Sequence, residues 1–245
     1  MYKCRSIKLK LIFYINMIKN YICKFILLTF LFVACKQTPQ QENANVPSVV
    51  ATDDDEKFPF SDLVNEFESM DRVIWQKPDI VLQKLGNIEG KTIADIGAGS
   101  GYFSFRMVNK AEKVIAIDID KRFIQFMDSI STQLPPLVES HFETRLATPT
   151  DPKLLTAEVD AVIIVNTYSY ITNRVSYLKT LINGMKGNAK LLIIDYKKKA
   201  TTIGPPTEER VAMDEVENEL KQAGFRDIVT DDTSLDFQYI VTAVR

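Results

Sequence analysis

Cysteine and histidine are scarce in this chain, and their scarcity removes several kinds of chemistry. The 245 residues include three cysteines, Cys4, Cys23 and Cys35, and a single histidine, His141. All three cysteines lie near the N-terminus, so the sequence after residue 35 offers no disulfide, no thiol nucleophile and no cysteine metal site. One histidine cannot supply the ligand set of a zinc site. We therefore expect no metal in the body of the protein.

Clustered positive charge is also missing from the body. The whole chain has a net charge of -2. Residues 1–34 hold six basic residues and no acidic one, which leaves 24 basic and 32 acidic residues for the rest of the chain. Non-specific binding to nucleic acids requires clustered lysines and arginines that contact phosphates. The acidic body argues against nucleic acid as a partner.

The N-terminal region has no apolar run long enough to cross a bilayer. Residues 25–34 are uncharged and mostly apolar, but ten such residues are too few for a membrane-spanning helix. Lys19 and Lys24 precede them, as in the basic region of a signal peptide. An uncleaved membrane anchor and a buried N-terminal helix are the alternatives.

The letters FVAC, which end at Cys35, resemble the signal of a bacterial lipoprotein, in which small residues precede a cysteine that becomes lipidated. Phe32 stands where a leucine is usual. We expect translation to start at Met17, which gives the signal a more typical length. The resemblance implies a lipidated Cys35 and a membrane-anchored protein of a bacterial envelope, with a cytoplasmic protein as the alternative.

Composition divides the chain into three parts. Residues 1–35 are the expected signal peptide. Residues 36–59 are rich in glutamine, asparagine, proline and aspartate, which predicts a disordered tether. Residues 60–245 have a globular composition and form the expected folded domain.

Within residues 60–245, apolar strand patterns alternate with amphipathic helix patterns. This alternation predicts an α/β fold with a doubly wound, mostly parallel seven-stranded sheet, whose ligand binds at the carboxyl ends of the strands. The last two strands, 227–231 and 238–244, have no helix between them and should form an antiparallel pair. The other predicted strands are 91–97, 113–118, 143–148, 160–166 and 189–195, and the predicted helices are 61–70, 77–86, 102–109, 121–131, 173–185 and 214–224.

The most informative segment is IADIGAGSGYF, residues 93–103. Glycines occur at every second position after the first strand, at Gly97, Gly99 and Gly101, and allow a close approach of the backbone to a ligand. The dinucleotide fingerprint would place its third glycine where Tyr102 stands. Asp95 would repel a pyrophosphate but suits a ligand with a positive end. A tight turn without a ligand is the alternative.

This segment resembles the first motif of class I S-adenosylmethionine (SAM)-dependent methyltransferases, an acid followed by three alternate glycines. The resemblance implies SAM as the cofactor. It implies that Asp118, at the end of the second strand, binds the ribose hydroxyls, whereas Asp120 faces solvent or caps a helix. Thr148 and Asp151, after the third strand, are the implied residues near the adenine. Another doubly wound nucleotide binder is the alternative.

The ends of the fourth and fifth strands should supply the chemistry. IVNTYSY resembles the fourth-strand motif of small-molecule methyltransferases, which implies that Asn166 binds the amino-acid end of SAM. Tyr168 and Asp195 are the leading catalytic candidates, and Tyr196 is expected to face the same crevice as Asp195. For the tyrosines, core packing with a satisfied hydroxyl is the alternative. Trp75 is expected either in a lid over the ligand or in packing.

Two functions of different class remain open. The first is a SAM-dependent methyltransferase acting on a small-molecule acceptor, without assistance from a histidine. The second is a catalytically degenerate SAM-binding lipoprotein used for sensing or protein contact. The sequence does not distinguish an oxygen, nitrogen, sulfur or carbon acceptor, and it predicts no oligomeric state.

Overall fold

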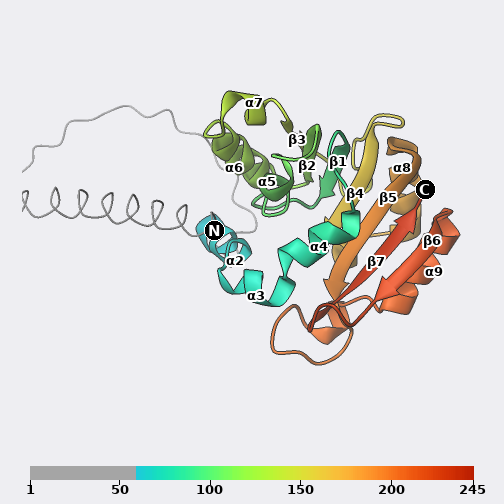
Figure 1. Cartoon of the computed structure of the whole chain (residues 1–245). Coiled ribbons are helices and arrows are strands. Elements are labelled where there is room, and N and C mark those ends of the chain that lie inside the picture. The colour runs from blue at the N-terminus through green and yellow to red at the C-terminus, as the bar shows by residue number, and fades with distance from the viewer. Residues whose placement is uncertain (1–58) are drawn as a thin grey trace, which may run out of the picture. The chain divides into compact units, whose positions relative to one another are not determined.

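The computed structural model describes residues 59–245 (Figure 1). The expected signal peptide, its lipidated Cys35 and nearly all of the tether lie outside the described residues. Within residues 59–245, no helix is long and apolar enough to cross a membrane.

Seven strands form one mixed sheet in the order β3-β2-β1-β4-β5-β7-β6. The neighbours among the first five strands pair in parallel, whereas β7 is antiparallel to both β5 and β6. This arrangement confirms the predicted fold class and the antiparallel C-terminal pair. The strands are β1 Thr92–Ile96, β2 Lys113–Asp118, β3 Phe142–Leu146, β4 Val159–Val165, β5 Met185–Tyr196, β6 Arg226–Asp231 and β7 Gln238–Val244.

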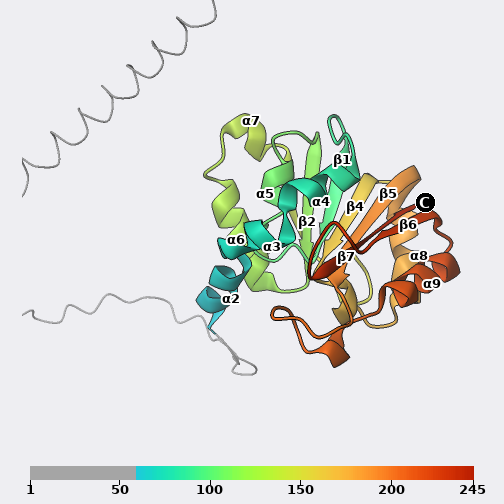
Figure 2. The same ribbon diagram turned by 60° about the horizontal axis from the view of Figure 1, so that its bottom comes forward.

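Helices cover both faces of the sheet (Figures 1 and 2), which explains why the central strands are apolar at nearly every position. Neighbouring strand residues point to opposite faces, so Ile163 packs in the core beside α4, and Ile164 packs in the core beside α8 and α9. The helices are α2 Phe60–Phe67, α3 Asp71–Gln76, α4 Pro78–Leu85, α5 Ser104–Met107, α6 Lys121–Ser131, α7 Pro136–Glu139, α8 Arg174–Gly184 and α9 Met213–Ala223, with 3₁₀ turns η2 Tyr168–Tyr170 and η3 Thr207–Glu209.

The main departures from the sequence prediction lie near the N-terminal edge of the domain. The predicted helix 61–70 ends at Phe67, and a separate helix, α3, follows. The predicted helix 102–109 is shortened to α5. The aromatic rings of α2 reach α6, because Phe60 and Phe67 both pack on Phe123. Helices α2 and α3 therefore belong to the domain rather than to the tether.

Candidate functional site

The glycine turn connects β1 to α5 at the carboxyl end of the sheet. Gly97, Gly99 and Gly101 have φ angles of 70°, 55° and 84°, a region that other residues adopt only at a cost. The N–H groups of Gly97 and Ala98 donate to the carbonyl oxygen of Ile117, at 2.8 and 3.0 Å. The turn is therefore fixed against the end of β2.

Side chains from distant parts of the chain pack on this turn. A Cβ atom at Gly97 would overlap the side chain of Thr167, which follows β4. A Cβ atom at Gly99 would lie 2.9 Å from the ring of Phe67 on α2. The absence of side chains thus lets β4 and α2 approach the turn closely.

Asp118 lies directly across the glycine turn. Its carboxylate accepts hydrogen bonds from the N–H of Gly99 at 2.8 Å and from the N–H of Asp120 at 2.9 Å. Only 8% of the residue is exposed, and burial raises the pKa of its carboxyl group. Asp120 instead caps α6 by accepting from the N–H of Arg122. The structure thus brings Asp118, and not the Asp120 side chain, to the turn.

Asp95 lies behind the turn rather than on its surface. The residue is buried, and the hydroxyl of Ser104 donates to its carboxylate at 2.6 Å. Burial raises the pKa of Asp95 to about 6, although the hydrogen bond from Ser104 and the positive charge of Arg72 offset part of the rise. A new positive charge near Asp95 would favour its ionised form.

Arg72, on α3, is a site residue that the sequence pattern did not indicate. Its guanidinium lies 4.1 Å from the centroid of the Tyr102 ring and donates to the carbonyl oxygen of Phe67 at 2.7 Å and to Gln76 at 2.5 Å. Burial lowers its pKa, and the nearby Asp95 partly counters that effect. The residue brings a half-buried positive charge to the glycine turn.

A chain of buried amides ties α3 to two strand ends. Gln76 donates to Gln238 of β7 at 3.2 Å, and Gln238 donates to the side chain of Asn166, which follows β4. Gln76 and Gln238 are both fully buried. Asn166 therefore lies at the carboxyl edge of the sheet, where the sequence places it, with its side-chain oxygen held by protein.

Segment 60–76, which comprises α2 and α3, covers the glycine turn. Besides the contact of Phe67 with Gly99, the carboxylate of Glu68 accepts from the hydroxyl of Ser100 at 2.6 Å. The ring of Phe67 stacks on Phe123 with centroids 5.3 Å apart. We call residues 60–76 the covering segment.

The candidate adenine residues lie after β3, next to Asp118. Thr148 and Asp151 pair through their backbones, and the carboxylate of Asp151 binds Lys153 at 2.8 Å. Ile119, directly after Asp118, is 59% exposed, which is unusual for an isoleucine at a buried strand end. No motif in the sequence marked Ile119, because its exposure depends on how the strand ends.

Tyr168 is fully buried, and its hydroxyl points away from the glycine turn. It donates to the carboxylate of Glu219 on α9 at 2.6 Å, and burial together with Glu219 raises its pKa. Arg174 also binds Glu219. These contacts favour the packing interpretation of Tyr168 over a catalytic one.

Asp195 and Tyr196 face opposite sides of the sheet, contrary to the expectation that they share a crevice, because adjacent strand residues alternate. The Asp195 carboxylate is 1% exposed, accepts from the N–H groups of Tyr196 and Ser169, and has its pKa raised by burial. The ring of Tyr196 lies 6.0 Å from Trp75 of α3. Asp195 thus braces the turn after β4, whereas Tyr196 and Trp75 lie together.

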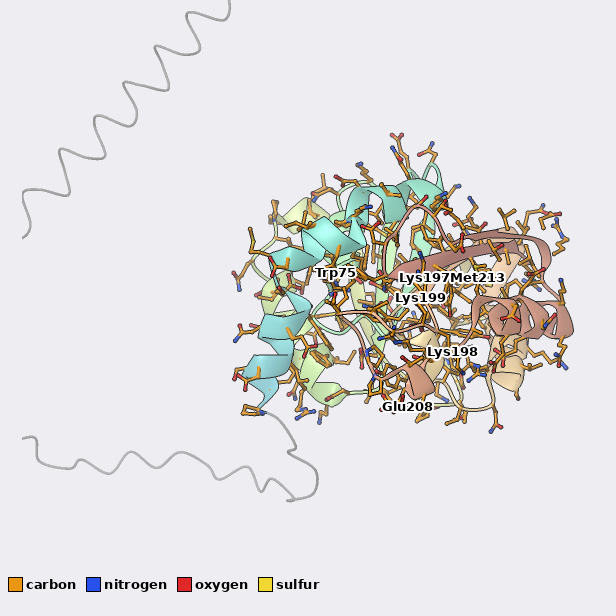
Figure 3. All side chains as sticks on the ribbon, turned by 90° about the horizontal axis from the view of Figure 1, so that it is seen from below. Trp75, Lys197, Lys198, Lys199, Glu208 and Met213 are labelled. Carbon is orange, nitrogen blue, oxygen red and sulfur yellow. The ribbon has the colours of Figure 1, made fainter. Side chains whose placement is uncertain are left out.

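Burial raises the pKa of Tyr196 to about 12, and Arg72 and Tyr170 are among the groups that act on it electrostatically. Tyr170 is 62% exposed. Figure 3 shows Trp75 on the same face of the molecule as Lys197 and Lys199, which follow β5. Tyr196 thus interacts with Tyr170, Trp75 and Arg72, and we call Trp75, Tyr170 and Tyr196 the aromatic group.

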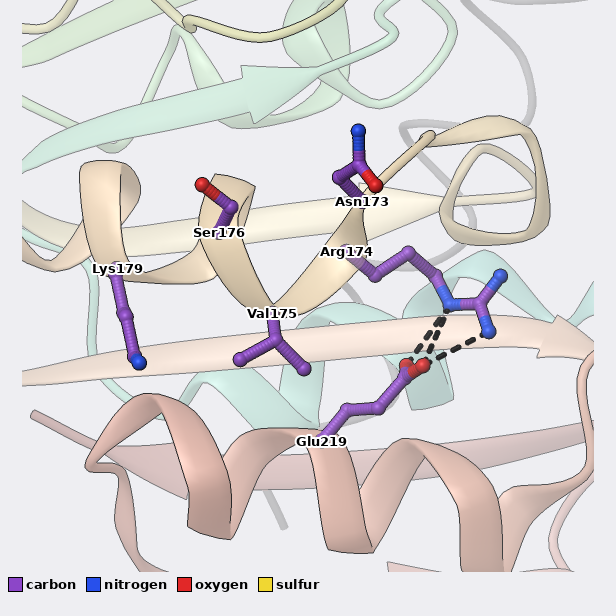
Figure 4. Close-up of a pocket in the computed structure, with 6 residues that line it drawn as sticks. All are labelled: Asn173, Arg174, Val175, Ser176, Lys179 and Glu219. Carbon is purple, nitrogen blue, oxygen red and sulfur yellow. Dashed lines mark hydrogen bonds and ion pairs between the residues drawn. The ribbon is translucent and has the colours of Figure 1, made fainter.

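A cavity of about 550 Å³ lies elsewhere, between α8 and α9 (Figure 4). It is walled by the ion pair of Arg174 with Glu219, which separates it from Tyr168. No residue of the glycine turn lines it. The lining residues are Asn173, Arg174, Val175, Ser176, Lys179 and Glu219.

We expect Tyr168→Phe to lower the free energy of unfolding by about 1.5–3 kcal/mol, the range for a hydrogen bond to a charged group, because Glu219 loses a buried donor. Cofactor binding should not change, since the hydroxyl faces α9. Urea unfolding and calorimetry measure the two effects. A loss of cofactor binding with unchanged stability would restore Tyr168 to the site.

Comparisons with known proteins agree with this geometry. A family model described as "Methyltransferase domain" matches residues 88–241. A search of curated proteins finds no match.

Among solved structures, a SAM-dependent methyltransferase from Aquifex aeolicus is 26% identical, with a TM-score of 0.68, over 77% of this chain and 99% of that one. A phosphoethanolamine N-methyltransferase from Haemonchus contortus, solved with S-adenosylhomocysteine, is 13% identical with a TM-score of 0.58, over 77% of this chain and 60% of that one. The cyclase SpnF is 11% identical with a TM-score of 0.59, over 69% of this chain and 80% of that one. The last two show a shared fold.

Proposed function

The chain belongs to the methyltransferase-domain family, and from that premise we propose that it transfers a methyl group from SAM to a small-molecule acceptor. One observation carries the proposal. The Asp118 carboxylate and the glycine turn meet at the carboxyl edge of the sheet, joined by the hydrogen bond from Gly99. An acid at this position can accept from two neighbouring hydroxyls of a ribose.

The residues around the turn fit SAM in charge as well as in position. Arg72 supplies a half-buried positive charge suited to a carboxylate, and Asp95 supplies a buried acid suited to a positive group. The hydroxyl of Tyr102, which follows the last glycine, is buried without a hydrogen-bond partner among residues 59–245. A polar ligand at this place would satisfy a group that the protein leaves unpaired.

Each residue has a distinct role in this proposal. Asp118 holds the ribose, and Ile119 with the Thr148–Asp151 turn flanks the adenine.

At the other end of the cofactor, Arg72 binds the methionine carboxylate, and Asp95 favours the positive end of SAM. Asn166 orients the covering segment through Gln238 and Gln76 in addition to lying near the amino-acid end of the cofactor.

When bound, SAM supplies a methyl group that is already activated on a sulfonium. The protein then has to position the acceptor in line and exclude water, which supplies much of the rate without a general base. We assign this task to the aromatic group, because Trp75 is on the same helix as Arg72 and its ring lies 6.0 Å from that of Tyr196. A base is needed only for an acceptor that must lose a proton.

A SAM-binding protein without transferase activity is the second candidate. One observation favours it: Tyr168 and Asp195, the leading catalytic candidates in the sequence, are both engaged in internal hydrogen bonds. Similarity of fold does not distinguish the two, since the cyclase SpnF shares the fold.

We further propose that Cys35 is lipidated and that residues 36–59 tether the domain to a membrane. The support is the sequence alone: a basic segment, ten uncharged residues and a small residue before the cysteine. A Cys35→Ser variant should accumulate as a larger, unprocessed precursor. A wild-type protein that fractionates as soluble and carries no lipid would overturn the anchor.

The binding test uses calorimetry of the purified protein with SAM and, separately, with NAD. SAM should bind with micromolar or better affinity, and NAD should not, because Asp95 disfavours a pyrophosphate and Tyr102 stands where the dinucleotide fingerprint has its third glycine. Tighter binding of NAD would overturn the proposal. Recovery of radiolabelled methyl groups in added acceptors then distinguishes a transferase from a protein that only binds.

Binding of SAM should strengthen about tenfold between pH 5 and pH 7. The positive end of SAM favours ionised Asp95, and a group with a pKa of about 6 passes from one-tenth to nine-tenths ionised over that range. Without ligand, the pH dependence of folding stability has the opposite sign. Between about pH 4 and pH 6 the folded state holds a proton on Asp95 that the unfolded state has lost, so the free energy of unfolding falls as the pH rises through that window. Calorimetry across this pH range should show a step that Asp95→Asn removes. A wild-type affinity that is flat in pH would place Asp95 away from the ligand.

A further inference from the structure

Helix α3 exposes apolar side chains on one side. Met70, Val73 and Ile74 are 84%, 48% and 73% exposed, and their spacing places them on one face of a helix. We call these three residues the α3 apolar face. The other side of the helix carries Arg72 and Gln76, which hold α3 to the domain.

This face has no role in holding the domain together. Single exposed apolar residues are normal in proteins, but a contiguous group marks a contact surface. The other large apolar residues exposed in residues 59–245 are scattered over the sequence: Ile119, Leu137, Leu146, Leu155, Tyr170 and Val229. In the part of the chain that the structure describes, only residues 70–74 hold three exposed large apolar side chains within five positions.

The sequence before the described residues indicates what covers the face. The chain reaches α2 at Pro59, and α3 follows α2 after three residues. Residues 36–59 separate this point from Cys35. For the disordered tether that the composition predicts, the mean end-to-end distance is about 27 Å. A lipid on Cys35 would therefore keep α2 and α3 within a few nanometres of the bilayer.

We propose that the α3 apolar face inserts into the interfacial layer of the bilayer that carries the Cys35 anchor; the proposal rests on the proposed lipidation. The contact is apolar rather than electrostatic. Exposed Asp71 and Glu66 lie on the covering segment, and exposed Lys198 and Lys199 follow β5, so the exposed surface of these segments carries both signs of charge. Attachment should hence depend little on the anionic lipid content.

A membrane contact at α3 would orient the site. Trp75 is on the same helix, and its ring lies 6.0 Å from that of Tyr196 in the aromatic group. With α3 inserted, the aromatic group lies near the bilayer surface, where an acceptor that partitions into lipid is concentrated. The lipid anchor then holds the protein at the membrane, and the apolar face fixes the orientation of the domain there.

The single tryptophan of the chain makes the contact measurable. In an Ile74→Trp/Trp75→Phe variant, the only tryptophan lies on the α3 apolar face. The full lipidated protein is incorporated into phosphatidylcholine vesicles with brominated acyl chains, which quench tryptophan on contact. We expect at least half of the fluorescence to be lost. The wild-type protein, whose Trp75 faces Tyr196, should be quenched less.

Two controls separate the contact from the anchor. A Leu137→Trp/Trp75→Phe variant, with its tryptophan on α7, should float with the vesicles unquenched. Met70→Ser/Val73→Ser in the reporter background should also float, with quenching largely lost.

A reporter that floats without being quenched overturns the contact and leaves the anchor intact. If cross-linking then joins two copies through α3, a second copy covers the face instead. A wild-type protein that does not float overturns the anchor and, with it, the contact.

Discussion

Replacing Gly97 by alanine is expected to lower the free energy of unfolding by about 2–5 kcal/mol. Alanine at a φ of 70° costs about 1–2 kcal/mol. The new Cβ also overlaps the side chain of Thr167, and overpacking of this kind costs about 1–3 kcal/mol. Urea unfolding followed by circular dichroism measures the change.

Gly90 provides a matched control for this prediction. Its φ is also positive, at 67°, but a Cβ there would meet nothing within 4 Å. Gly90→Ala should hence cost only the conformational term of about 1–2 kcal/mol. Thr167→Ala removes two of the atoms that overlap at Gly97 and should recover part of the difference. Equal effects of the two glycine substitutions would show that Thr167 does not contact the turn.

Replacing Asp118 by alanine is expected to weaken SAM binding by about 1.5–3 kcal/mol, or roughly 10- to 150-fold. The substitution removes the carboxylate that faces the proposed ribose. It also removes the acceptor for the N–H of Gly99, so the turn loses a contact that fixes it. Calorimetric titration measures the affinity.

Asp120→Ala is the control, two residues away on the same loop. Asp120 accepts from the N–H of Arg122 at the start of α6, so its loss should cost about 1 kcal/mol of stability and leave SAM affinity nearly unchanged. A larger loss of affinity for Asp120→Ala than for Asp118→Ala would mean that Asp120 faces the ligand.

The fold and the centre of the candidate site could be predicted because their signals are local. Nearly continuous apolar runs such as residues 160–165 identify strands buried on both faces. Three alternate glycines identify a turn of positive φ, and an acid at the end of the next strand falls beside it in any parallel sheet. Gly97, Gly99, Gly101 and Asp118 required no knowledge of distant contacts.

The periphery of the site could not be predicted, because its contacts are distant in sequence. Arg72 is an ordinary arginine in a short polar stretch until α3 folds over Tyr102. Tyr168 follows the fourth strand as a catalytic group would, but the 3₁₀ turn at 168–170 directs its hydroxyl to Glu219. The sequence assigns Asp195 to the site because it lies at the end of the fifth strand. The face of the sheet to which its carboxylate points is decided by the alternation of side chains along the strand, and there it accepts from the N–H of Ser169.

The hydrogen bond between Gln76 and Gln238 joins residues 162 positions apart. Gln76 is near the start of the domain, and Gln238 is in its last strand. During synthesis the covering segment emerges first and can pack on Phe123 early, but Gln76 gains its buried partner only after the C-terminal strand has left the ribosome and entered the sheet. Because contacts of such separation form slowly, the cover over the glycine turn should become complete late in folding, and cofactor capture should be among the last steps of the domain's assembly.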